Sequence, residues 1–84
     1  MKTPSAFISN VNKLLDYGFN RDFKCAYFKK PCYYRVVKHP VYLIVLKNTK
    51  ELKLVTPNGF AAFIDAHKDK FQDLIDSDLV KFVG

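Results

Sequence analysis

The sequence predicts a single α+β domain: an N-terminal helix, a three- to four-stranded antiparallel sheet and a long amphipathic C-terminal helix, with a possible short final strand. This prediction is based on changes in the spacing of apolar residues along the chain. Apolar residues recur every three or four positions near both ends of the chain, whereas they alternate with polar residues in the middle. A chain of 84 residues has enough apolar surface for one thin core, so we expect one domain over residues 1–84.

The N-terminal segment has the start signal of a helix. Thr3 can act as an N-cap, and Pro4 suits the first helical position. Gly18 is a suitable C-terminal stop. The apolar stripe between these signals consists of Phe7, Ile8, Val11, Leu14 and Leu15. We therefore expect a helix over about residues 4–17.

A period of two begins at residue 21 and predicts a β-hairpin. The break at Lys29-Lys30-Pro31 suggests a four-residue loop over 28–31, and a two-residue loop would give the same register. That register pairs Lys24 with Arg35, Cys25 with Tyr34, Ala26 with Tyr33, and Tyr27 with Cys32. It places both cysteines on the apolar face, where they are expected to be small buried hydrophobic residues.

Two further strands follow the hairpin. The motif Lys38-His39-Pro40 indicates either a turn or a bend in one long strand. The continuous apolar run Val41–Leu46 predicts a central strand covered on both faces. Residues 47–50 form a predicted turn before a strand at Glu51–Val55. In the expected pairing, Leu43 and Val45 lie opposite Leu54 and Leu52.

The C-terminal third predicts a long helix. Residues 56–59 can be a helix start or a turn, and the helix is expected from Phe60 to about residue 76. Its apolar stripe is Phe60, Phe63, Ile64, Phe71, Leu74 and Ile75, and its solvated side is Asp65, Asp69, Asp73 and Asp76. His67 falls within the stripe, as a core histidine. Residues 78–83 can form a strand or a helical tail, and their composition favours a strand.

Charge is distributed unevenly along the chain. The net charge is +6, and residues 21–39 contain six Lys or Arg against one Asp. Such a field attracts polyanions or acidic protein surfaces. The longest apolar run has six residues, which is too short for a signal peptide or a membrane span. We therefore expect a cytoplasmic, reducing setting, with no membrane association.

The basic hairpin is the first candidate site. Lys24 and Arg35 would repel each other across the exposed face, unless an anion lies over them. Phe28 and Tyr33 share that face and could stack on bases. The predicted nucleic-acid or anionic-partner site consists of Arg21, Lys24, Phe28, Lys29, Lys30, Tyr33, Arg35 and Lys38. Binding would use counterion release and ring stacking, with a solvated lysine-rich hairpin as the simpler interpretation.

A protein interface is the alternative. If both helices pack on one side of the sheet, Tyr42, Ile44 and Leu46 lie exposed and could form a docking surface or a homodimer. The chain would then be an inhibitor or adaptor, of the type encoded by phages and mobile elements, that blocks a host protein. If one helix covers each face, which we favour, this interface does not exist.

Catalytic patterns are weak in this sequence. Cys25 and Cys32 are expected to point inward, with no histidine near them in sequence to act as a base. The three glycines, Gly18, Gly59 and Gly84, do not form a phosphate-binding loop. Two cysteines and two histidines fall short of a zinc-ligand set. We expect no enzymatic activity, no cofactor and no metal.

Overall fold

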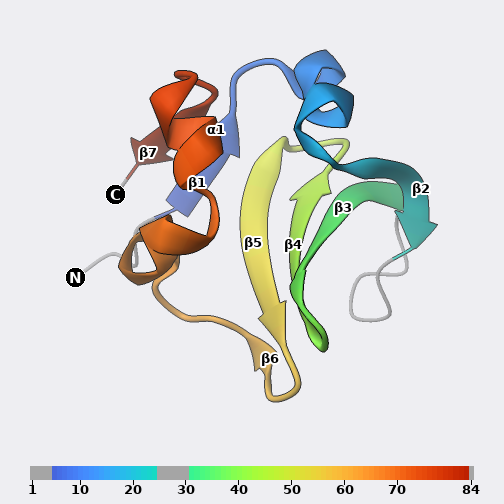
Figure 1. The fold of residues 1–84 in the computed structure, drawn as a ribbon, viewed down its shortest axis with the longest axis vertical. Helices are drawn as coiled ribbons and strands as arrows, with labels where there is room; N and C mark the ends of the chain where they lie inside the picture. Colours follow the sequence, from blue (N-terminus) through green and yellow to red (C-terminus); the bar gives the residue numbers. More distant parts are fainter. Residues whose placement is uncertain (1–4, 25–30, 84) are drawn as a thin grey trace.

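The structure is a computed structural model that describes residues 5–24 and 31–83, with side chains described for residues 5–21 and 32–83. Most of it is one antiparallel sheet of seven strands, in the order β2-β3-β4-β5-β1-β7, with β6 paired to β5 (Figure 1). The elements are β1 Ser5–Ile8, the 3-10 helix η1 Val11–Tyr17, β2 Asn20–Lys24, β3 Pro31–Lys38, β4 Val41–Leu46, β5 Glu51–Thr56, β6 Gly59–Phe60, the 3-10 helix η2 Ile64–Lys70, α1 Gln72–Asp76 and β7 Val80–Val83. The predicted α+β fold with two flanking helices is therefore wrong.

The predicted N-terminal helix is replaced by strand β1 followed by the short helix η1. Ala6 pairs with Leu52 of β5 on one side and with Phe82 of β7 on the other. Ala6 and Ile8 are buried while their neighbours are half-buried, which is the alternation of a strand. The helical start signal is Asn10, whose Oδ1 accepts from the Asn12 backbone N–H at 3.1 Å. Thr3-Pro4 lies outside the described residues.

The hairpin register is also different from the prediction. Lys24 lies opposite Pro31, and Phe23 lies opposite Cys32, so Lys24 does not face Arg35. Pro31 was interpreted as part of the loop, but it is the first residue of β3. Proline is tolerated at the first position of a strand, because its missing N–H need not contribute to the ladder there. The predicted pairs that involve residues 25–27 lie outside the described residues.

The central strands match the prediction. β4 spans Val41–Leu46, and its Leu43 and Val45 lie opposite Leu54 and Leu52 of β5. The break at residues 38–40 is a turn, since β3 and β4 pair antiparallel on either side of it.

The long C-terminal helix is absent from the described residues. Phe60 pairs with Val55 as part of a tight hairpin, so the turn interpretation of residues 56–59 is the right one. The remaining stripe is divided into η2 and α1, which are separated at Phe71 (φ −141°). His67 is half-buried and itself leaves helical geometry, with φ −115°. The division places the Phe71 ring, with 0% exposure, in the core. A strand does form at the end, as β7.

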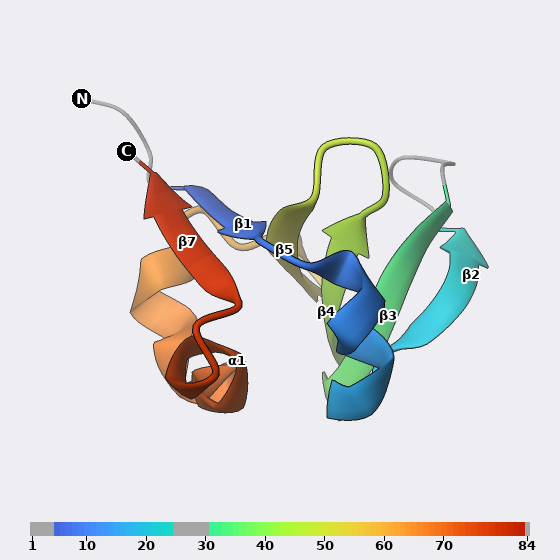
Figure 2. The same cartoon turned by 90° about the horizontal axis from the view of Figure 1, so that it is seen from above.

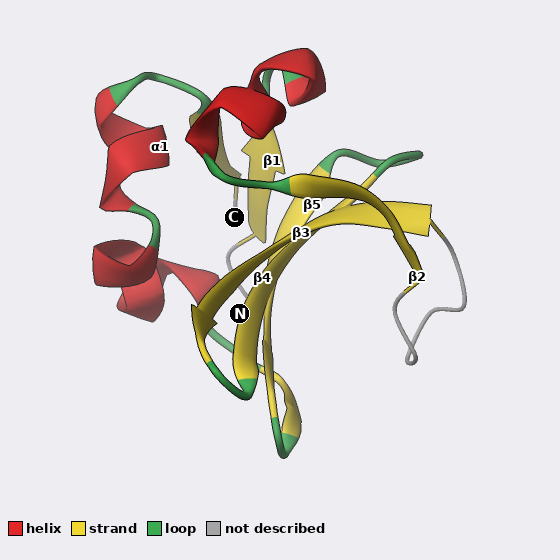
Figure 3. Ribbon diagram, turned by 45° about the vertical axis from the view of Figure 1, so that its right-hand side comes forward, coloured by secondary structure: helices red, strands yellow, loops and turns green. Residues whose placement is uncertain are grey.

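All three helical segments lie on one side of the strongly curved sheet (Figures 2 and 3). We call this side the helical face, and it contains the main core, in which twelve of the described residues are buried, among them Leu14, Leu43 and Phe71. The opposite side, which we call the outer face, carries Tyr34, Val36, Tyr42, Ile44, Lys53 and Phe60. None of the described helices has the length and apolar character needed to span a membrane.

Candidate functional site

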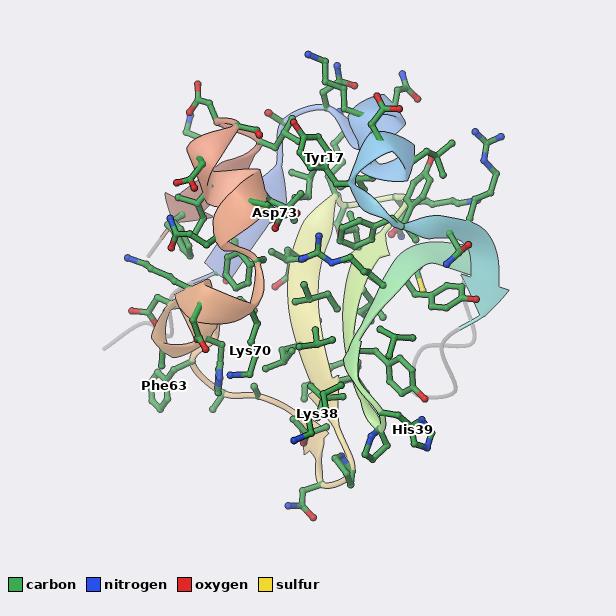
Figure 4. The ribbon with its side chains drawn as sticks, viewed as in Figure 1. Tyr17, Lys38, His39, Phe63, Lys70 and Asp73 are labelled. Carbon is green, nitrogen blue, oxygen red and sulfur yellow. The ribbon has the colours of Figure 1, made fainter. Side chains whose placement is uncertain are left out.

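Arg35 links strand β3 to all three helical segments. Its Nη1 donates to the Tyr17 carbonyl oxygen at 3.0 Å and to Asp73 Oδ2 at 2.7 Å. Its Nη2 donates to the Lys70 carbonyl oxygen at 3.0 Å and to Asp73 Oδ1 at 3.2 Å. The guanidinium carbon lies 5.0 Å from the centroid of the Phe19 ring. Figure 4 marks Tyr17, Lys70 and Asp73, the three residues that accept these bonds. Arg35 is thus fully engaged within the protein.

Of the predicted nucleic-acid site, the structure describes the side chains of Arg21, Tyr33, Arg35 and Lys38, and two of these, Tyr33 and Arg35, are engaged in contacts within the protein. Tyr33 is on the helical face, half-buried against the main core, with Lys47 Nζ 5.2 Å from its ring centroid. Arg21 is exposed on β2. Lys38 is exposed where β3 turns into β4, opposite Val41 of the helical face. The Lys24 side chain and residues Phe28, Lys29 and Lys30 lie outside the part of the chain that is described.

The outer face contains two rows of side chains that cross the strands. In the first row, Tyr34 of β3, Ile44 of β4 and Lys53 of β5 are successive partners. In the adjacent row the partners are Val36, Tyr42, Val55 and Phe60. The three rings among them come from β3, β4 and β6, and all are half-buried. Ring residues from separate parts of the chain therefore share one surface.

The rings close a small second core beneath them. Cys32 and Ile44 are 0% exposed and Leu46 is 7% exposed, and the rings of Tyr34, Tyr42 and Phe60 pack against this cluster. Ile44 and Leu46 are therefore not available as interface anchors, and only Tyr42 of that predicted set is partly accessible. The burial of β4 on both faces agrees with its apolar run. The second cover consists of rings, whereas we expected a helix.

Polar groups lie next to these rings. Lys53 Nζ is 5.4 Å from the centroid of the Phe60 ring and 3.3 Å from Glu51 Oε2. His39 Nδ1 and the Tyr42 hydroxyl are hydrogen-bonded at 3.0 Å. Val36, which faces Tyr42 across the strands, is 50% exposed. Sequence reasoning missed this site because it places Tyr34 opposite Cys25 on the apolar side of the hairpin and expects Phe60 in a helix.

Charge differs between the two sides of the molecule. Residues 65–78 carry five Asp and two Lys, a net −3, so the remainder of the +6 chain carries +9. This acidic segment forms η2, α1 and the turn after α1, on the helical side of the sheet. On the outer side of β5 and β7, the charged residues are Lys53, Lys81 and Glu51, with Lys53 and Glu51 forming an ion pair. The helical side also carries Arg35, Lys38 and Lys47, so the aspartates there are largely balanced by cations.

No protein-family model, curated protein or solved structure matches this chain. Within residues 5–24 and 31–83, no group of three or more His, Cys, Asp or Glu side chains is placed to hold a metal ion.

Proposed function

We propose that this protein is a non-enzymatic binding protein that holds single-stranded nucleic acid across its outer face. The observation that carries the proposal is the group of half-buried rings in adjacent rows of a sheet surface that none of the described helical segments covers, beside Lys53. Aromatic rings on a sheet provide stacking platforms for unpaired bases, and a neighbouring cation attracts the phosphates. We place this activity in the cytoplasm.

Tyr42 is the central ring in this proposal. It belongs to the inner strand β4, and its hydroxyl is held by His39, which limits the positions that the ring can take. A ring that is already ordered loses little side-chain entropy when a base stacks on it. Stacking on one aromatic side chain contributes about 1–3 kcal/mol per base.

Duplexes are expected to bind more weakly than single strands. Paired bases do not expose the faces that rings could stack on, so a duplex would be held by phosphate contacts alone. With about two phosphate contacts, from Lys53 and Lys81, single-strand affinity should fall roughly 7-fold between about 50 and 200 mM salt.

The test is fluorescence anisotropy of labelled single-stranded DNA, RNA and duplex DNA at these two salt concentrations. Tyr42→Leu should weaken single-strand binding by roughly 5- to 150-fold, whereas Tyr42→Phe keeps the ring and should change it less than about 3-fold. Lys53→Gln and Lys13→Gln remove the same charge from opposite sides of the sheet, and only the first should weaken binding strongly. Equal effects of the two lysine variants would contradict the assignment to the outer face.

Docking of another protein on the same surface is the second candidate. Val36 is half exposed beside the rings, and exposed apolar residues among aromatic ones are typical of protein interfaces. In that case no nucleic acid binds at about 50 mM salt, and Val36→Asp abolishes capture of a protein partner while the fold is retained.

A further inference from the structure

An open depression lies beside the rings. It is formed between the start of β1, the edge of β5 and the segment that follows β6, and it contains about 460 Å³ of empty space, including its open mouth. Its walls include Ser5, Leu52, Ala61 and Ala62, and its charged groups are Glu51 and Lys53. Lys53 also contacts the Phe60 ring, so the depression and the ring surface share a residue.

The two charged groups can be separated at low cost. The Glu51 side chain is 24% exposed and the Lys53 side chain is 30% exposed, and their atoms are 3.3 Å apart. An ion pair that remains accessible to water contributes about 0–1 kcal/mol. A ligand that offers donors to the carboxylate and an acceptor to the ammonium could therefore replace the pair with two stronger contacts.

We propose that this depression receives a single unpaired guanine base. The inference rests on the proposed function, because it assigns the base preference of that same surface. Guanine carries two adjacent donors, N1–H and the N2 amino group, beside the acceptor O6. The carboxylate of Glu51 accepts from both donors, and the ammonium of Lys53 donates to O6. The walls formed by Ala61 and Ala62 contact the apolar faces of the base.

The other bases do not match this pattern. Adenine and cytosine each place a ring nitrogen acceptor next to their amino group, and this lone pair would face the carboxylate. Thymine and uracil have one N–H between two carbonyl oxygens, so a carboxylate gains one bond and meets a repelling oxygen. A well-placed polar pair discriminates against a wrong base by about 1–3 kcal/mol, or roughly 5- to 150-fold in affinity.

The test compares the binding of four labelled DNA decamers by fluorescence anisotropy. One is a run of thymidines, and the others carry a single central dG, dA or dC. The decamer with dG should bind about tenfold more tightly than the other three. Glu51→Gln should reduce this preference to less than about twofold and leave the affinity for the thymidine decamer almost unchanged. Asp65→Asn removes an equal charge from the helical side and should retain the preference.

A second variant keeps the test independent of Glu51. Ala62 is exposed at the wall, so Ala62→Leu should be tolerated by the fold while it narrows the depression and lowers the dG preference. Thymidine-decamer binding without a dG preference would overturn the guanine site and leave the proposed function intact. A dG preference that survives in both Glu51→Gln and Ala62→Leu would also overturn the site. No binding of any decamer would overturn the proposed function and the guanine site together.

Discussion

Replacement of Arg35 by methionine tests how the helical layer is attached to the sheet. Methionine retains much of the apolar stem but has no donors. The variant therefore leaves the Tyr17 and Lys70 carbonyl groups without their charged partner and removes the ion pair with Asp73. The Arg35 side chain is only 17% exposed, so water replaces these contacts incompletely.

The expected loss follows from the individual contacts. Each hydrogen bond from the guanidinium to a carbonyl contributes about 1.5 kcal/mol. The ion pair contributes less than about 1 kcal/mol, because the Asp73 side chain is 49% exposed. The contact with Phe19 adds about 0.5 kcal/mol. The total is about 4 kcal/mol, against a free energy of unfolding of roughly 4–13 kcal/mol for a chain of this length.

The measurement is urea-induced unfolding followed by far-UV circular dichroism. Arg35→Met should lower the free energy of unfolding by about 4 kcal/mol, and Asp73→Asn by less than about 1 kcal/mol. Arg35→Lys keeps the charge but loses the planar fork, and should fall between them. If Asp73→Asn destabilises the protein as much as Arg35→Met, the carbonyl contacts do not carry the stabilisation and the reasoning is wrong.

Three further predictions concern the two cores and one turn. Ile44→Asp should unfold the protein, because the side chain is 0% exposed, whereas Val36→Asp on the same face should retain the native circular dichroism spectrum. Phe71→Ala should cost about 3–5 kcal/mol in urea unfolding, and Phe63→Ala less than about 0.5 kcal/mol, since Phe63 is 57% exposed and points away from the sheet (Figure 4). Lys50→Gly should raise the melting temperature, because Lys50 has φ 65° and glycine adopts this left-handed conformation without strain. No change or a decrease would mean that the relief of strain is offset by the greater backbone entropy of glycine in the unfolded state.

The sequence predicts the middle of the fold better than its ends. The run Val41–Leu46 and its pairing with β5 are recovered, because a short apolar segment between clear turn residues allows few alternatives. Helical spacing at the ends is misleading. Ala6 and Ile8 belong to a strand, and their partner β7 is distant in sequence, so no local signal identifies it.

The candidate site shows the same limitation. The hairpin register differs by four residues at Phe23, and an even shift leaves Arg35 on the same face of the strand. Arg35 is expected to be exposed because the sequence does not show which face of the sheet the helical segments cover. Successive side chains of a strand point to opposite faces, so a wrong choice of the buried face misplaces every side chain of that strand. The ring surface also requires Phe60 to be in a strand, and the sequence favoured a helix there. A site assembled from β3, β4 and β6 therefore depends on tertiary pairing that local patterns do not contain.

The position of β1 between β5 and β7 has a consequence for the order of folding. Ser5 near one end of the chain pairs with Val83 near the other, and Ser9 N–H donates to the Leu79 carbonyl oxygen at 2.9 Å. Closing such a long loop costs entropy before any contact compensates for it. During synthesis, strands β2 to β5 can pair as soon as they emerge, but β1 cannot gain its second neighbour until residue 83 has left the ribosome. Although β1 precedes the other described strands, it is thus among the last of them to be secured.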